Sequence, residues 1–242
     1  MQTNETLIVS DTHGLEFWHK VINTDLPVVM LGDYLDFYPD YKVTREQEKQ
    51  EFLDIIQFKK ENPDRVTLLM GNHLDHYCGI SEDLARFSYD YALDYYNIIN
   101  ENKDLFKIVH KVDNVIYSHA GITTGWLKFN NIAEDPNTIE SEINKFKVFN
   151  DSFVNNPSWF LGDAKNPLGQ ISRGRGGYFW DGSCEWASLE EMWDNSAFKD
   201  SLIQIFAHTR LKETGTFIHK DNFYMCDSRA IFKWDGENFE RF

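Results

Sequence analysis

The sequence predicts an α/β fold, and two observations support that prediction. Short aliphatic runs typical of buried strands alternate with longer segments of helical periodicity, which indicates helices packed on a sheet. Each core strand is also followed by a side chain that can bind a metal ion or transfer a proton. Ligands of open α/β sheets gather beyond the carboxyl ends of the strands, so we expect one site there.

Five aliphatic runs predict the core strands. They are TLIVS (6–10) before Asp11, PVVML (27–31) before Gly32 and Asp33, VTLLM (66–70) before Gly71 and Asn72, NVIYS (114–118) before His119, and IQIFA (203–207) before His208. Chance would place such a residue after one or two strands. Five of them favour a shared site over five separate loops that face the solvent.

Two segments predict helices packed against these strands. Residues 44–60 have apolar side chains at helical spacing, and Thr44 with Gln47 fits a capping box at their start. Residues 81–100 have the same periodicity and open with Ser81. The order of strand, helix and strand indicates α/β layers.

The other segments are expected to complete a single domain over residues 1–242. Residues from about 122 to 202 form a candidate insertion that shapes the substrate site, with a Gly-rich loop inside it. Short helices are expected within the insertion, at residues 138–149 and 189–198. Residues 216–242 alternate in hydrophobicity around a hairpin turn at Asp235, and they predict antiparallel strands that finish a sheet.

Composition limits the compartment and the partners. A net charge of −15 and a pI near 4.9 argue against general affinity for nucleic acid or anionic membranes, because the field of the protein repels them. The start MQTNETLIVS does not resemble a secretion signal, and no apolar run reaches the roughly 20 residues of a membrane span. Cys78, Cys184 and Cys226 lack paired spacing and are interpreted as reduced structural thiols. We therefore expect a cytoplasmic protein without a membrane partner.

The residues after the strands favour catalytic metal chemistry. Carboxylate, imidazole and amide ligands suit Mn²⁺, Fe, Zn²⁺ or Mg²⁺, and they differ from the thiolate sets of structural zinc. Asp11 and His13 can hold one ion, and Asp33 can bridge to a second ion. The second ion would be held also by Asn72, His119 and His208. Two such ions, with Mn²⁺ the expected metal, would activate a water molecule for in-line attack on phosphorus.

Five short motifs carry a resemblance to a known family. They are DTH at Asp11, GDYLD at Gly32, GNH at Gly71, SHAG at Ser118 and AHT at Ala207. In order and spacing they resemble the motifs of the calcineurin-like metallophosphoesterases, which include the serine/threonine protein phosphatases. The resemblance implies two packed mixed β-sheets flanked by helices, with a dinuclear metal centre built from the six ligands above. It also implies that His73 is the general acid for the leaving oxygen and that Asp36 orients it.

The chain departs from this pattern beside the GNH motif. Leu74 stands where the family has a carboxylate, and Asp75 follows it. Asp75 either fills that role from a shifted position or is a solvated loop acid. His76 is interpreted as structural, because the set of metal ligands is complete without it.

Further departures bear on the substrate. Phe37 and Tyr38 follow GDYLD where the protein phosphatases have an arginine, which weakens a phosphoprotein assignment. Asp36 stands where purple acid phosphatases have a tyrosine ligand. Thr209 and Arg210 follow His208, so the HxH ending common in diesterase-like members is missing.

Arginines in the candidate insertion offer a phosphate-binding group. Arg173 and Arg175 lie in QISRGRGGYFW, and a guanidinium fork matches the geometry of phosphate. The alternative is a surface loop whose arginines pair with the many acidic residues. Arg210 is a third candidate by its position, and an RNA-binding role is disfavoured by the net charge. Nearby aromatic residues could stack on a nucleobase or form the core of the insertion, namely Trp159, Phe160, Tyr178, Phe179, Trp180 and Trp186.

These observations predict a metal-dependent hydrolase of phosphate monoesters, in phosphoproteins or small molecules. A hydroxide that bridges the two metal ions would attack phosphorus while His73 protonates the leaving group. A dinucleoside polyphosphate hydrolase or phosphodiesterase is the alternative within the enzyme class. A non-catalytic scaffold with this fold is the alternative of another class, and it would be expected to have lost ligands or the general acid.

Overall fold

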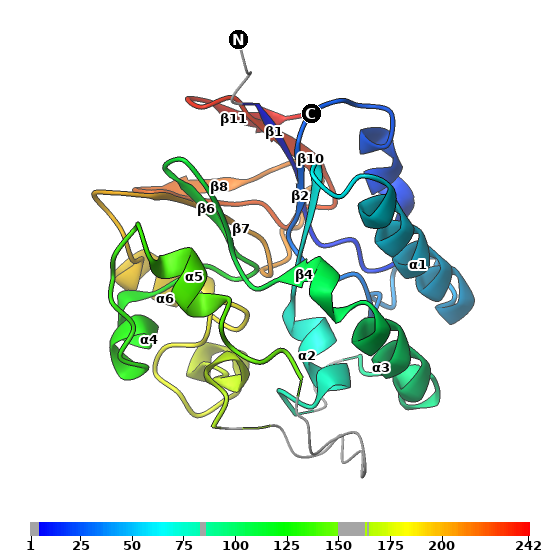
Figure 1. Cartoon of the computed structure of the whole chain (residues 1–242), viewed down its shortest axis with the longest axis horizontal. Helices are drawn as coiled ribbons and strands as arrows, with labels where there is room; N and C mark the ends of the chain where they lie inside the picture. Colours follow the sequence, from blue (N-terminus) through cyan, green and yellow to red (C-terminus); the bar gives the residue numbers. More distant parts are fainter. Residues whose placement is uncertain (1–4, 83–85, 150–162, 164) are drawn as a thin grey trace.

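A computed structural model describes residues 5–82, 86–149, 163 and 165–242. Two mixed β-sheets pack face to face, and helices cover their outer faces (Figure 1). This is the two-sheet α/β architecture that the sequence motifs imply. No helix among the described residues is long and apolar enough to cross a membrane.

The first sheet has six strands and contains three of the five predicted core strands. In spatial order they are β11 (Phe239–Arg241), β10 (Ile231–Trp234), β1 (Thr6–Val9), β2 (Val28–Met30), β3 (Val66–Leu69) and β4 (Phe106–Lys107). The strands β1 to β4 are parallel, with Leu7 opposite Val28, whereas β10 runs antiparallel to β1. The parallel register brings the carboxyl ends of β1, β2 and β3 to one edge.

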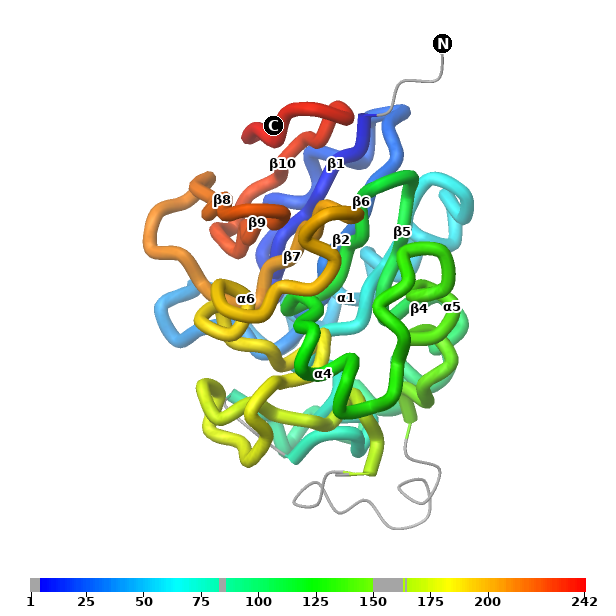
Figure 2. Tube along the Cα trace, turned by 90° about the vertical axis from the view of Figure 1, so that its left-hand side faces the viewer, coloured from blue at the N-terminus to red at the C-terminus, as the bar shows by residue number. Residues whose placement is uncertain are grey.

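The second sheet has five strands and contains the other two predicted core strands. In spatial order they are β5 (His110–Val112), β6 (Val115–Tyr117), β7 (Ile203–Phe206), β9 (Phe223–Met225) and β8 (Ile218–Lys220). Figure 2 shows them side by side in front of β1 and β2. Because β6 and β7 are parallel, the residues that follow them also lie at one edge.

Alternating side chains on β1 explain the layers. Ile8 packs with Val115 and Ile205 of the second sheet, in the apolar core between the sheets. Leu7 and Val9 belong to the larger core on the opposite face, which also includes side chains of helix α1. This period of two is the pattern expected for a strand buried on both faces.

Helix α1 (Arg45–Glu61) confirms the first predicted helix. The Thr44 hydroxyl accepts a hydrogen bond from the Gln47 amide, and the Gln47 side chain accepts one from the Thr44 amide, which completes the predicted capping box. Two helices follow on this side of the molecule, α2 (Asn72–Cys78) and α3 (Ala92–Glu101). Three more α-helices lie in the described part of residues 122–202, namely α4 (Thr124–Phe129), α5 (Ile139–Ile143) and α6 (Leu189–Asn195).

Three predicted helices are shorter than the periodicity suggested. The helix expected over 81–100 begins only at Ala92, since Arg86 has a φ of 72°, which no α-helix accommodates, and Tyr89–Tyr91 form a 3-10 turn. The helix expected over 138–149 ends at Ile143, where the side chain of the next residue, Asn144, bonds to the backbone of Val109 instead. The helix expected over 189–198 ends at Asn195, since the Ala197 amide donates to the Ile122 carbonyl.

The C-terminal segment forms antiparallel hairpins, as predicted, but it completes both sheets rather than one. The hairpin of β8 and β9 joins the second sheet, where β9 pairs with β7. The hairpin of β10 and β11 joins the first sheet, and its turn includes Asp235. The apolar alternation could not distinguish these destinations, because both hairpins bury one face in the core between the sheets.

Candidate active site

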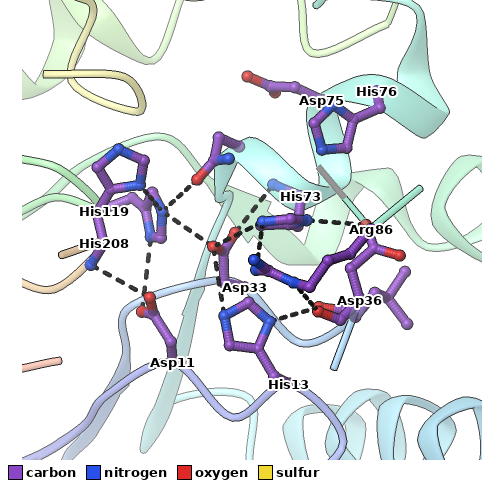
Figure 3. A network of polar contacts seen from close by, with 12 residues as sticks. Asp11, His13, Asp33, Asp36, His73, Asp75, His76, Arg86, His119 and His208 are labelled. Carbon is purple, nitrogen blue, oxygen red and sulfur yellow. Dashed lines mark hydrogen bonds and ion pairs between the residues drawn. The ribbon is translucent and has the colours of Figure 1, made fainter. Parts of the chain in front are cut away.

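The side chains that follow the five core strands converge at one edge of the two sheets (Figure 3). The Nε2 atom of His119 lies 2.9 Å from Asn72 Oδ1, 3.0 Å from His208 Nδ1 and 3.4 Å from Asp33 Oδ2. Asp33, His119 and His208 form one group whose candidate ligand atoms lie within 4.8 Å of one another. Asp11, His13 and Asp33 form a second such group, so Asp33 belongs to both.

The orientation of two imidazoles directs their lone pairs at these groups. His119 Nδ1 lies 2.8 Å from the Leu31 carbonyl, and His13 Nδ1 lies 2.6 Å from the Leu35 carbonyl. A carbonyl only accepts, so each Nδ1 carries the hydrogen and each Nε2 is left with a lone pair. This is the arrangement in which a histidine serves as a metal ligand.

The buried carboxylates of the site give it the negative charge expected of a cation-binding site. Asp11 and Asp33 are buried, and Asp11 Oδ1 has no hydrogen-bond partner among the described residues. Burial raises the pKa of Asp11 well above its usual range, and the negative charges of Asp227 and Asp33 add to this effect. Burial acts to raise the pKa of Asp33 too, but His119 and His73 outweigh it and hold that pKa well below its usual range. Carboxylates crowded in this way fit one or two divalent cations.

The backbone of the site is strained. His13, Asp33, Asp36, Arg86 and His208 all have positive φ values, between 44° and 72°. Non-glycine residues rarely adopt this conformation, and it costs on the order of 1 kcal/mol or more at each position. Such strain clusters at functional sites because it fixes the direction of side chains.

Two glycines let the strand ends approach one another. Gly32 has a φ of 107°, a conformation that favours glycine. A Cβ atom at Gly71 would lie 2.5 Å from the backbone nitrogen and from Oδ1 of Asp33. The GD and GN pairs of the sequence therefore reflect close packing of the turns that carry Asp33 and Asn72.

Asp36 and His73 form a hydrogen-bonded pair beside the two groups. His73 Nδ1 lies 2.8 Å from Asp36 Oδ2, and the His73 amide donates to Asp33 Oδ1 at 2.9 Å. The Tyr77 hydroxyl donates to Asp36 Oδ1 at 2.6 Å, so the carboxyl group is fixed from two sides. Burial raises the pKa of Asp36 to about 6 and lowers the pKa of His73 to about 3.

A cavity of about 290 Å³ opens onto these residues. Its lining comprises Asp33, Tyr38, Asn72, His73, His76, Arg86, Arg175, Trp186 and His208. Arg175 is therefore the one arginine of the three sequence candidates that lines this cavity within the described parts of the chain. Its Nη2 donates to the Thr209 hydroxyl, and burial lowers its pKa.

The other two candidate arginines lie against aromatic rings. The guanidinium of Arg173 stacks 3.7 Å from the ring centroid of Trp180. Arg210 forms a two-pronged ion pair with Asp40, at 3.1 and 2.6 Å, and its guanidinium lies 4.2 Å from the ring centroid of Tyr38. The site therefore brings Arg175, and not Arg173, to the cavity that His73 lines.

Sequence reasoning missed Arg86 and gave no role to Tyr38. Arg86 Nη2 lies 2.8 Å from His73 Nε2, and its guanidinium stacks 3.8 Å from the ring centroid of Tyr38. Arg86 lies in the segment that was expected to be helical, thirteen residues after His73. No motif marks it, because no strand ends there.

Asp75 and His76 are part of the interior beside the site. Asp75 is fully buried, which rules out a solvated loop acid, and its Oδ2 accepts a hydrogen bond from Trp186 Nε1 at 3.3 Å. His76 forms a third group of candidate ligand atoms with Asp36 and His73. Its Nδ1 lies 2.9 Å from the Glu82 carbonyl, which fixes the ring, and its Nε2 has no hydrogen-bond partner among the described residues.

The aromatic residues of the candidate insertion divide between core and surface. Trp186 is buried and lines the cavity, between His76 and His208. Tyr178 and Trp180 are exposed, and Phe179 packs edge-on against Phe129. Trp159 and Phe160 lie outside the described residues.

Comparisons with known proteins find similarity only at the level of structure. No family model matches the sequence, and no curated protein matches it. A structure of a protein serine/threonine phosphatase from Saccharomyces cerevisiae, described as similar to human phosphatase PP5, matches with a TM-score of 0.51 and 14% identity. The match covers 96% of this chain and 73% of that one. A metallophosphoesterase from Sphaerobacter thermophilus matches with a TM-score of 0.41 and 11% identity, over 98% and 88% of the two chains. The first likeness shows a shared fold, the arrangement of two mixed β-sheets flanked by helices that the sequence motifs implied.

Proposed function

We propose that this protein is a metal-dependent phosphoesterase that hydrolyses phosphate monoesters. One observation carries the proposal: Asp33 belongs to both groups of candidate metal ligands. The hydrogen-bonded pair of His73 and Asp36 lies beside these groups. Two divalent ions bridged by one carboxylate, next to a proton donor, form a recurrent arrangement for in-line displacement at phosphorus.

The donor set fits two divalent cations. Asp11, His13 and Asp33 would hold the first, and Asp33 would also hold the second together with Asn72, His119 and His208. Asp11 Oδ1, which accepts no hydrogen bond from the described residues, and the crowded lone pairs around His119 Nε2 favour a bound cation over a purely structural network. When bound, such ions, with Mn²⁺ the expected metal, would lower the pKa of water in the site and neutralise charge on the phosphoryl group.

The residues of the chain supply the proton and the orientation. Asp36 accepts the Nδ1 hydrogen of His73, so Nε2 is the ring atom that faces the cavity. In the proposed reaction, His73 first takes a proton from water at Nε2, then donates that proton to the leaving oxygen and returns to the neutral form, while Asp36 fixes the ring. Tyr77 holds Asp36 in turn, which limits rotation of the pair.

The candidate insertion would complete the substrate site. Arg175 and Trp186 both come from residues 122–202 and both line the cavity. We propose that Arg175 binds a phosphate oxygen, because a guanidinium offers paired donors and the protein otherwise repels anions. The three buried free thiols, together with this substrate chemistry, are consistent with a cytoplasmic enzyme acting on phosphorylated small molecules or proteins.

Replacing Arg175 with alanine is expected to raise KM for a phosphate monoester by about tenfold to a hundredfold, since a hydrogen bond to a charged group contributes roughly 1.5–3 kcal/mol. Arg173→Ala should have a smaller effect, because that side chain stacks on Trp180. Steady-state kinetics with both variants makes the comparison. Equal KM values for Arg175→Ala and the wild type would show that Arg175 does not bind substrate.

A dinucleoside polyphosphate hydrolase is the second candidate, favoured by the aromatic ring of Trp186 in the cavity lining. A panel of p-nitrophenyl phosphate, its bis-ester, a phosphopeptide and a dinucleoside tetraphosphate tests the choice. The proposal predicts the highest kcat/KM on a monoester. A preference for the tetraphosphate or the bis-ester would move the assignment to the corresponding alternative.

A further inference from the structure

We propose that Arg86 is a phosphate-binding residue that hydrogen-bonds to His73 in the free protein and transfers to the phosphoryl group when substrate binds. The inference rests on the proposed function, because it names the group that would recognise the substrate in the same cavity. It assigns the substrate-binding role to a residue outside every motif of the sequence.

Three contacts fix the guanidinium of Arg86 at the cavity, and Figure 3 shows its polar contacts. Its Nε donates to the Asp36 carbonyl at 2.7 Å, and its Nη2 lies 2.8 Å from His73 Nε2. Its plane lies over the ring of Tyr38, 3.8 Å from the centroid, in a cation–π contact. The guanidinium therefore lies beside the proposed proton donor and within the lining of the cavity.

The backbone of Arg86 is held in a strained conformation. Its φ of 72° lies in the left-handed region, and its carbonyl accepts a hydrogen bond from Arg45 Nη2 at 3.0 Å. Arg45 also pairs with Asp36 Oδ1 at 3.3 Å. The loop that carries Arg86 is thus tied to the same carboxylate as His73, which aims the guanidinium at the site.

The contact with His73 cannot persist while His73 protonates a leaving group. A guanidinium only donates, so His73 Nε2 must accept in this contact. The same nitrogen cannot at that moment donate to a leaving oxygen. Arg86 therefore has to leave Nε2 during the reaction, and an anionic phosphoryl oxygen is a stronger acceptor for it than a neutral imidazole.

The charged residues that line the cavity support the transfer of Arg86 to a phosphoryl group. Arg86 and Arg175 are the two arginines in the cavity lining, which also includes Asp33 and His208 from the proposed metal site. Two guanidinium groups beside the metal ligands provide local positive charge in a chain with a net charge of −15. A phosphoryl group bound there would accept hydrogen bonds from Arg86 as His73 is released.

The test measures the affinity for inorganic phosphate by calorimetry in the Mn²⁺-loaded protein, together with kcat and KM on p-nitrophenyl phosphate. Arg86→Ala is expected to weaken phosphate binding by about tenfold to a hundredfold and to raise KM by a similar factor. Arg86→Lys keeps the positive charge but lacks the paired donors of a guanidinium, so its phosphate affinity should lie between those of the wild type and Arg86→Ala. Arg241→Ala, an exposed arginine of β11, is the control and should match the wild type.

A second measurement follows His73 directly. In the Zn²⁺-loaded protein, adding phosphate should shift the ¹⁵N resonance of His73 Nε2 in the wild type, because Arg86 leaves that atom. The shift should be absent in Arg86→Ala. If that variant does not fold, Arg86→Lys answers the same question.

Unchanged phosphate affinity in a folded Arg86→Ala protein would overturn the inference. So would a fall in kcat at constant phosphate affinity, since that result assigns Arg86 only to the support of His73 and Asp36. A failure of the proposed hydrolase function would give a different experimental result. A wild-type protein that binds phosphate through Arg86 but hydrolyses no phosphoester would refute the hydrolase and leave this binding site in place.

Discussion

Changing Asp33 to asparagine is expected to remove metal binding and hydrolysis together. The substitution keeps the shape of the side chain but removes the charge that lies 3.4 Å from His119 and 3.9 Å from His13. Loss of a residue behind a metal ligand typically costs 10–100-fold in metal affinity, so loss of a shared ligand should cost at least about a hundredfold. Equilibrium dialysis with Mn²⁺, alongside the hydrolysis of p-nitrophenyl phosphate, measures both effects.

The matched control is Asp25→Asn, which removes one carboxylate from the exposed surface. It should bind metal and turn over as the wild type does. An Asp33→Asn protein that keeps both its metal and its full turnover would refute the assignment of Asp33 as the bridging ligand.

Replacing His73 with asparagine is expected to lower kcat by about 10²–10⁴ while the metal content stays the same. His73 belongs to neither of the two groups that share Asp33, and its ring instead pairs with Asp36. The variant therefore removes the proton donor without removing a proposed ligand. Metal analysis and steady-state kinetics on the same preparation separate the two properties.

The leaving group provides a further check on this role. A substrate with a good leaving group, such as p-nitrophenyl phosphate, should lose less rate in His73→Asn than an alkyl phosphate, because its leaving oxygen needs less protonation. His219→Asn, on strand β8, is the control histidine. Equal losses on both substrates would contradict the role of general acid.

The sequence was sufficient to predict which side chains gather at the edge of the sheets, for a physical reason. Parallel neighbours such as β1 and β2 end at the same edge of a sheet, so residues placed directly after them must lie close together. Asp11 and Asp33 follow from that rule, whereas His119 follows a strand of the second sheet and meets them through the packing of the two sheets. The glycines before Asp33 and Asn72 also follow from it, because crowded turns leave no room for a Cβ atom.

Arg86 could not be predicted in this way. Its place depends on a left-handed backbone conformation that arginine rarely adopts, and on contacts with Asp36 and Tyr38 that are distant in the sequence. Apolar periodicity predicted a helix there, and tertiary contacts overrode it. Asp75 was ambiguous for a related reason, since its burial against Trp186 joins segments 111 residues apart.

The central claim is that Asp33 joins two metal positions into one hydrolytic site. The most direct measurement titrates the metal-free protein with Mn²⁺ and follows bound metal and the hydrolysis of p-nitrophenyl phosphate in the same samples. The account predicts two ions per chain, with turnover that rises as the second ion binds. Two bound ions without turnover on any phosphoester would favour a scaffold, and the absence of metal binding would contradict the account.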